Sequence, residues 1–216
     1  MENSTRHYSF LDQAIHCIDQ AIRTINTAGV IATRENPAKQ ISATNLTEPE
    51  RKHSAGLMRV DHTGEVCAQA LYQAQALFAH SDATRKSMQQ AADEENDHLV
   101  WCHERLQELN SHASYLNPFW YCGSFMLGAI ASVISDQHSL GFVAETEHQV
   151  VRHLEKHLNE LPSNDLKSQK ILQQMRDDEA KHATLAMQTG ANALPNFIKQ
   201  GMSLLSKVMT TTAYWV

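Results

Sequence analysis

Four pairs of residues with the spacing Glu-x-x-His could bind metal ions. Residues three apart share one face of a helix, so each pair can present a carboxylate and an imidazole to the same ion. The chain has 14 glutamates and 13 histidines among 216 residues, so chance alone yields about one such pair. The motif is therefore weak until the position of each pair on its helix is considered. The pairs are Glu50/His53, Glu95/His98, Glu145/His148 and Glu179/His182.

Helical phase favours two of these pairs, because a ligand inside a helical bundle must lie on the apolar stripe of its helix. Glu95 and Glu179 each lie in phase with apolar residues and are predicted to face the core. The residues in phase are Met88, Ala92, Leu99, Cys102 and Leu106 for Glu95, and Leu172, Met175 and Ala186 for Glu179.

The pair Glu50/His53 has another explanation. Thr47, Pro49 and Glu50 form the pattern of a capping box at the start of a long helix. His53 lies in the polar first turns of that helix. We therefore predict that neither residue of this pair is a ligand.

Two single glutamates interrupt apolar stripes elsewhere. Glu147 is the polar residue within the stripe of the helix expected from Ser139, which turns Glu145 and His148 away from the core. Glu65 does the same in the helix that begins near Thr47. Both glutamates are predicted to point inward.

The six inward residues form an internal repeat. A single Glu precedes its Glu-x-x-His unit by 30 residues in the first half and by 32 in the second, which predicts two similar helical hairpins. Four carboxylates buried together are very unfavourable unless cations neutralise them. Four carboxylates and two neutral imidazoles balance two divalent ions, and this mixed ligation suits iron, with manganese as the alternative. The predicted ligands are Glu65, Glu95, His98, Glu147, Glu179 and His182.

Two further acids stand directly before predicted ligands. Glu94 precedes Glu95, and Asp178 precedes Glu179. We predict that these two acids accept hydrogen bonds from the outer nitrogens of the ligand histidines across the bundle, which would fix the imidazoles. The alternative is that Asp177 and Asp178 are simply a solvated acidic pair.

The elements that must position these residues are helices. Apolar spacing and turn signals predict long helices over 47–80, 83–109, 139–161 and 165–189, flanked by helices over 8–30 and from Pro195 onward. The apolar segment 118–134 is predicted to be a crossover helix. The expected fold is all-α, a ferritin-like four-helix bundle with an apolar crossover helix and extra N- and C-terminal helices. We divide the chain into an N-terminal helix and linker, 1–46, and a domain of 47–216.

Composition excludes some functions and locations. The net charge is −6 and no basic cluster exists, so nucleic acid is not expected as a partner. Residues Met1 to Phe10 are polar and lack the apolar core of a signal peptide, which predicts a cytoplasmic protein. No stretch of 18 apolar residues is present, so no membrane span is expected.

The crossover segment has two possible environments. Its aromatic and apolar residues suit a membrane surface, but a helix buried against the bundle would also be apolar. The terminal helix, ending Tyr214-Trp215-Val216, leaves the same two possibilities open. The crossover residues concerned are Phe119, Trp120, Tyr121, Phe125, Met126 and Leu127.

Four motifs give the chain a family resemblance. Arg59-Val60-Asp61-His62-Thr63-Gly64-Glu65, Glu94-Glu95-Asn96-Asp97-His98, Ala144-Glu145-Thr146-Glu147 and Asp177-Asp178-Glu179-Ala180-Lys181-His182 resemble the demethoxyubiquinone hydroxylase family of ubiquinone biosynthesis, in its bacterial form. The resemblance runs from about residue 48 to the C-terminus. It implies two iron ions held by the six residues named above. His153 matches a family histidine near the iron, although an exposed helix histidine is the alternative.

The resemblance also implies an activity and a location. The implied enzyme is a monooxygenase that inserts one atom of O2 into the ring of demethoxyubiquinol, a polyprenyl quinol. It would be attached peripherally to the cytoplasmic face of the inner membrane. The electron donor, the length of the prenyl tail, and assembly into a homo-oligomer or a biosynthetic complex remain open.

Two other functions use similar residues. A ferritin-type ferroxidase or iron-storage protein shares the ligand plan but needs a hollow cage. A non-catalytic membrane scaffold could use the metals only to hold its bundle together. The mass of the particle and the reactivity of the ferrous protein with O2 distinguish these functions from the hydroxylase.

Overall fold

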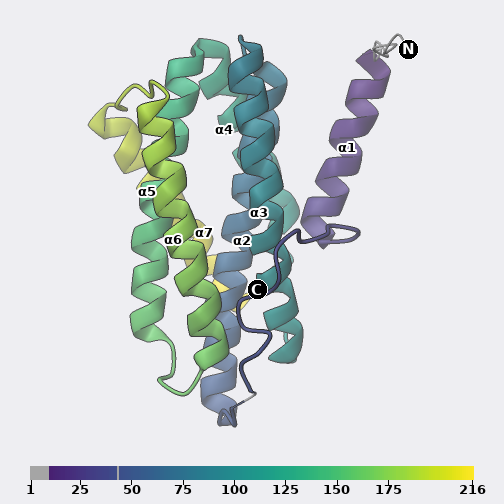
Figure 1. The fold of residues 1–216 in the computed structure, drawn as a ribbon, viewed down its shortest axis with the longest axis vertical. Coiled ribbons are helices and arrows are strands. Elements are labelled where there is room, and N and C mark those ends of the chain that lie inside the picture. Colours follow the sequence, from purple (N-terminus) through teal and green to yellow (C-terminus); the bar gives the residue numbers. More distant parts are fainter. Residues whose placement is uncertain (1–9, 43) are drawn as a thin grey trace.

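The computed structural model describes residues 10–42 and 44–216, and these residues form seven α-helices and no strand (Figure 1). The polar segment preceding Phe10, including the first two residues of the helix predicted over 8–30, lies outside the described residues. The helices are α1 (Phe10–Asn26), α2 (Glu48–Phe78), α3 (Asp82–Glu108), α4 (Asn117–Ile134), α5 (Asp136–Glu160), α6 (Leu166–Gln188) and α7 (Asn196–Trp215).

Four of these helices form the bundle. Helices α2 and α3 make one antiparallel hairpin, α5 and α6 make the other, and α4 runs back along α2 to connect them (Figure 1). This arrangement confirms the predicted all-α, ferritin-like bundle with a crossover helix. Helix α1 projects beside the bundle, and α7 packs across α2 and α5.

The helix ends follow local capping chemistry. Glu50 accepts hydrogen bonds from the backbone nitrogen and the hydroxyl of Thr47, each at 2.7 Å, which confirms the predicted capping box. Helix α5 begins at Asp136, earlier than the predicted Ser139, because the Ser135 hydroxyl accepts from the backbone nitrogen of His138 at 3.2 Å. Helix α1 ends at Asn26 because Thr27 adopts a left-handed φ of 53°.

The bundle core contains two apolar layers, beside a third apolar cluster that packs α4 against α2 and α3. One layer joins the start of α2 and α6 to the ends of α3 and α5, and the other lies toward the opposite end of the bundle. Along each of the four helices, the predicted ligands lie between the residues of one layer and the residues of the other. The first layer includes Leu57, Met58, Trp101, Leu106, Leu154, Leu172 and Met175, and the second includes Ala68, Tyr72, Met88, Leu140, Val143 and Ala186.

Helix α4 packs one side against the bundle and exposes the other. Its small residues pack against α2, where a Cβ on Gly128 would lie 2.7 Å from the carbonyl oxygen of Leu71. That close approach requires glycine. Most of its large apolar side chains instead face outward, and the most exposed are Phe119, Met126, Ile130, Val133 and Ile134.

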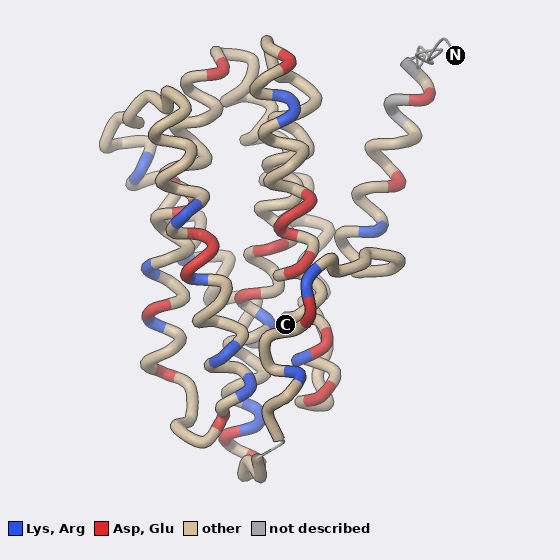
Figure 2. The backbone as a smooth tube through the Cα atoms, in the orientation of Figure 1, with Lys and Arg blue, Asp and Glu red and all other residues tan. Residues whose placement is uncertain are grey.

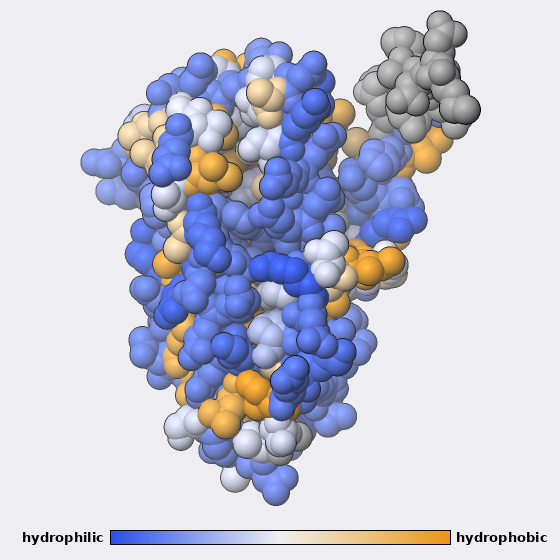
Figure 3. Space-filling model, viewed as in Figure 1, coloured by the Kyte–Doolittle hydropathy of each residue, from blue (hydrophilic) through white to orange (hydrophobic). Residues whose placement is uncertain are grey.

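The terminal helices also expose apolar side chains. Apolar residues of α1 and of the loop after it reach the surface in Figure 3, and Leu11 and Ile31 are 70% and 79% exposed. In α7, Phe197 and Leu204 are similarly exposed, whereas Tyr214 is held by a 2.7 Å contact between its hydroxyl and His53. Among the described residues, no helix is both long enough and apolar enough to span a bilayer.

One histidine of α2 is enclosed away from the predicted ligands. The ring of His62 is fully buried, with Nε2 3.0 Å from the Thr27 hydroxyl and Nδ1 3.4 Å from the Asn117 amide. Burial, assisted by the neighbouring His103, lowers the pKa of His62 to about 3. The folded protein therefore keeps this ring neutral at pH values where the unfolded chain protonates it.

We expect acid to destabilise the protein through His62. As pH falls below the ordinary histidine pKa of about 6.5, His62 binds a proton in the unfolded state but not in the folded state. The free energy of unfolding therefore decreases until the pH reaches the pKa of the folded state. Between pH 7 and 5 the loss from His62 should be about 2 kcal/mol. Urea unfolding should show a correspondingly smaller loss for His62→Gln, while His148→Gln, which changes an exposed histidine, keeps the wild-type loss. Equal losses in all three proteins would contradict this role.

Candidate di-metal centre

The four bundle helices bring all six predicted ligands to one place. Glu65 comes from α2, Glu147 from α5, and the two Glu-x-x-His units from α3 and α6. The acidic positions of α3 and α6 lie at mid-height of the bundle (Figure 2). All four glutamates and His98 are at most 3% exposed, and the side chain of His182 is 13% exposed.

The six residues form two overlapping clusters. Glu65, Glu95, His98 and Glu179 make the first, and Glu95, Glu147, Glu179 and His182 make the second. Within each cluster, one candidate ligand atom per residue lies within 4.8 Å of the others. Glu95 and Glu179 belong to both clusters, so two adjacent ions could share their carboxylates.

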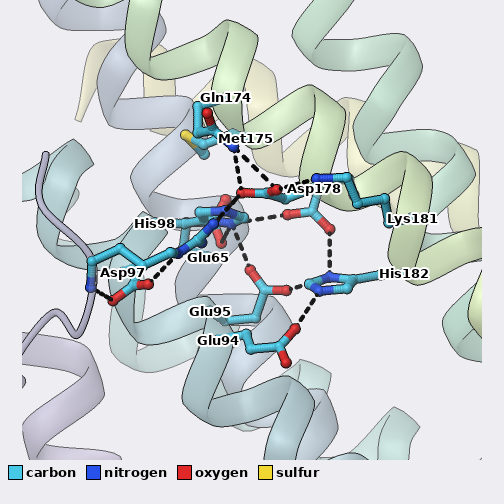
Figure 4. Close-up of polar contacts among 12 residues, drawn as sticks. Glu65, Glu94, Glu95, Asp97, His98, Gln174, Met175, Asp178, Lys181 and His182 are labelled. Atoms are coloured by element: carbon cyan, nitrogen blue, oxygen red, sulfur yellow. Dashed lines mark hydrogen bonds and ion pairs between the residues drawn. The ribbon is translucent and has the colours of Figure 1, made fainter. Parts of the chain in front are cut away.

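Both histidines turn the same ring nitrogen toward the shared carboxylates (Figure 4). Nδ1 of His98 lies 2.8 Å from Glu95 and 3.0 Å from Glu179. Nδ1 of His182 lies 3.0 Å from Glu95 and 3.5 Å from Glu179. Each Nδ1 atom is therefore in position to complete one of the two clusters.

Several buried atoms of the centre lack hydrogen bonds. Glu65 Oε2, Glu95 Oε1, Glu179 Oε2 and His182 Nδ1 are buried and form no hydrogen bond of suitable geometry, although His182 Nδ1 lies within ion-pair distance of the oxygens of Glu95 and Glu179. Buried polar atoms without partners are rare and unfavourable. All four are oxygen or nitrogen atoms of the kind that coordinates iron or manganese, so the residues fit a pair of such ions.

The charges of the centre are also unbalanced without cations. Burial, together with the neighbouring carboxylates Glu95 and Glu179, raises the pKa values of Glu65 and Glu147 well above the ordinary range. Burial lowers the pKa of His182, but Glu179 and Glu95 outweigh that effect and raise it to about 12. Protons thus provide the positive charge here, and metal ions would have to displace them.

The outer nitrogens of the two histidines contact the two acids predicted for them. Nε2 of His182 lies 2.8 Å from Glu94, and Nε2 of His98 lies 3.3 Å from Asp178. Asp177 is exposed whereas Asp178 is buried, so they are not a solvated pair. The influence of Glu94 and Asp178 on a bound metal remains a prediction.

The other two Glu-x-x-His units lie outside both clusters. Glu145 forms an ion pair with Lys199 of α7 at 3.1 Å, and His148 is exposed. His53 contacts the Tyr214 hydroxyl at 2.7 Å and so holds the end of α7. Glu145 and His53 thus attach the terminal helix to the bundle.

His153 is in neither ligand cluster and is not the exposed histidine of the alternative reading. It is half-buried and groups with Asp61 and His157, whose Nδ1 lies 2.8 Å from the Asp61 carboxylate. Burial, with the neighbouring His157, lowers the pKa of His153 to about 4. Asp61 precedes Glu65 by one helical turn, so this group lies next to the first cluster along α2.

Two contacts at the centre were not predicted. The Tyr72 hydroxyl donates to Glu147, and the linker residue Arg34 pairs with Asp178 at 2.7 Å. Tyr72 lies seven residues after Glu65 on the same stripe, and a buried tyrosine needs a hydrogen-bond partner, so its contact was foreseeable. Arg34 lies in a segment without periodicity and gave no such signal.

The fold and the site together define a class of protein. The protein is a ferritin-like helical bundle with a buried carboxylate and histidine centre that could hold two metal ions. The profile of a family described as "Ubiquinone biosynthesis protein COQ7" matches residues 52–213. The chain belongs to this family.

Similar proteins cover the chain almost from end to end. A 3-demethoxyubiquinol 3-hydroxylase of Nitrosococcus oceani is 54% identical over 211 residues, which are 98% of this chain and 99% of that protein. The protein of that name from Acinetobacter baumannii is 52% identical over 98% of this chain and its own full length. The one from Coxiella burnetii is 51% identical over the full length of both chains.

We expect divalent metal to stabilise the protein through this centre. An ion at 100 times its dissociation constant adds about 2.7 kcal/mol per site, or roughly 5–10 °C in Tm. Differential scanning fluorimetry of chelator-treated protein with added Mn2+ should show this rise. Glu147→Gln should raise the Tm of the metal-free protein, because the buried glutamate must take up a proton on folding and a glutamine need not, and it should reduce the gain on metal addition.

The matched control is Glu145→Gln, two residues away and outside both clusters. It should retain the full gain in Tm. A gain in Glu147→Gln as large as in the wild type would remove Glu147 from the metal centre.

Proposed function

We propose that this protein is a di-iron monooxygenase that hydroxylates the ring of demethoxyubiquinol with O2 in ubiquinone biosynthesis. The observation that carries the proposal is the pair of clusters sharing Glu95 and Glu179, buried in a chain of the COQ7 family. The full-length identity of 51–54% to 3-demethoxyubiquinol 3-hydroxylases supports the substrate.

The six clustered residues are the proposed ligands of two iron ions. One ion would be held by Glu65 and His98, the other by Glu147 and His182, and both by the shared glutamates. Bound as a pair, ferrous ions supply electrons for the reduction of O2. One oxygen atom enters the ring and the other leaves as water. The ring C–H bond supplies two of the four electrons that O2 takes up, and a donor must restore the two that the ferrous pair would give up, together with two protons, in each turnover.

The surrounding side chains have separate tasks. The apolar layers above and below the centre exclude water from it. The Tyr72 hydroxyl holds its proton against Glu147, and burial and that carboxylate raise the pKa of Tyr72 well above its ordinary value. A small pocket beside the second cluster is lined by Tyr72, Leu140, Val143 and His182, and also by polar residues such as Glu94.

The prenyl tail of such a substrate places the reaction at a lipid surface. We propose peripheral attachment to the cytoplasmic face of the inner membrane through the exposed apolar faces of α4 and α7. Residues 47–216 would form the hydroxylase domain, and residues 1–46 an N-terminal helix and linker.

Labelled oxygen gives the direct test of the reaction. Ferrous-loaded protein, a demethoxyubiquinol in detergent, a chemical reductant and 18O2 should yield hydroxylated quinol carrying one 18O atom by mass spectrometry. Consumption of O2 with accumulation of ferric mineral in a particle of cage size would instead indicate a ferroxidase. A ferrous protein that is inert toward O2 would indicate a scaffold.

Complementation tests the same function in cells. A bacterial strain that accumulates demethoxyubiquinone should recover ubiquinone when it carries the wild-type chain and should not recover with Glu147→Ala. His148→Ala, at the next position but exposed, should rescue as the wild type does. Rescue by Glu147→Ala would mean that this carboxylate is dispensable and that the proposed ligand set is wrong.

A further inference from the structure

The linker between α1 and α2 reaches the buried centre through Arg34. Its Nε atom donates to Asp97 of α3 at 2.5 Å, and its Nη1 atom donates to Asp178 of α6 at 2.7 Å. The two carboxylates come from the two different hairpins, and their side chains are only 1% and 8% exposed. One guanidinium therefore joins two buried acids across the bundle, and Figure 4 labels both acids.

The linker is fixed at Asp97 by more than this ion pair. The backbone nitrogen of Thr33 donates to Asp97 at 2.6 Å, and the guanidinium lies 4.9 Å above the ring of Trp101. Trp101 is buried, and its ring centroid lies 5.4 Å from that of His98. The position of the Arg34 head group is thus set by the α3 residues that surround His98.

Asp178 links Arg34 to the centre, beside a longer direct contact of 3.4 Å between Nη2 of Arg34 and Nε2 of His98. The Oδ2 atom that accepts from Arg34 also lies 3.3 Å from Nε2 of His98. Nδ1 on the other side of the same ring faces Glu95 and Glu179. When Nδ1 binds a metal, Nε2 carries the proton and donates it to Asp178, so the placement of Asp178 sets the angle of the imidazole.

The corresponding contact in the other half of the repeat is built differently. Glu94, which contacts His182, has a side chain that is 44% exposed. Its other hydrogen-bond partner is Gln90, from its own helix, at 2.9 Å. Asp178 is buried and, besides Gln174 and Lys181 of its own helix, takes an arginine from outside the four-helix bundle, so the two histidines are supported unequally.

We propose that Arg34 is a positioning residue that fixes His98 through Asp178, so that the metal position at Glu65 and His98 depends on the N-terminal linker and the position at Glu147 and His182 does not. This inference rests on the di-metal site of the proposed function. Arginine suits the task because its planar fork can serve two carboxylates at once, whereas an ammonium group offers a single point charge.

The test measures metal binding rather than turnover. Anaerobic calorimetric titration of chelator-treated protein with Co2+ should show two equivalents in the wild type. In Arg34→Met one equivalent should weaken by about 10–100-fold, the usual effect of removing a residue that orients a ligand, and the other should remain. Arg34→Lys should recover only part of the loss.

A spectroscopic readout separates positioning from a merely structural role. Each Co2+-bound histidine should give one strongly shifted imidazole N–H proton in the NMR spectrum. Arg34→Met should alter one of the two signals, through faster exchange with water, and Glu94→Gln should alter the other. The double variant Arg34→Met/Asp178→Asn should lose little more affinity than either single variant, because both changes break one chain of contacts.

The outcomes differ from those that test the proposed function. Equal weakening of both equivalents, change in both signals, or no change in either would overturn the role of Arg34, even in a protein that hydroxylates its substrate. Two Co2+ equivalents with the selective response, in a protein without hydroxylase activity, would support Arg34 and contradict the function. A wild-type chain that binds no Co2+ would contradict both.

Discussion

The constraint on which the structure depends is the burial of four carboxylates in one layer of a helical bundle. Glu65, Glu95, Glu147 and Glu179 are at most 3% exposed, and two histidines are the only bases within their clusters. Such a layer is strongly unfavourable without compensating positive charge. Protons meet that requirement in part, as the raised pKa values of Glu65 and Glu147 indicate, and two divalent ions would meet it fully.

The rest of the fold follows from holding that layer in place. Two similar hairpins each contribute a glutamate and a Glu-x-x-His unit, and apolar layers on both sides keep the centre away from water. The repeat is not symmetric in its supports, however. Asp178 is buried and paired with Arg34 from the linker, whereas Glu94 is partly exposed. A symmetric set of ligands is thus placed in unequal surroundings.

Local sequence predicted most of this arrangement. Helical phase separated Glu95 and Glu179 from the pairs at Glu50 and Glu145, because a residue on an apolar stripe must face the core. Arg34 could not be predicted, since its role depends on how a linker without periodicity folds over α3 and α6. The environments of α4 and of His153 depended in the same way on packing between helices. The exposure of the apolar face of α1 was not predicted. Amphipathic spacing predicts that a helix has an apolar face, but it does not predict which element packs against that face.

The most direct measurement of the central claim is an anomalous difference map, collected at the iron absorption edge, from crystals of the ferrous-loaded protein. We expect two peaks about 4 Å apart, the usual separation in two-metal sites, with Glu95 and Glu179 between them. Peaks confined to the group of Asp61, His153 and His157, or no peak inside the bundle, would contradict it.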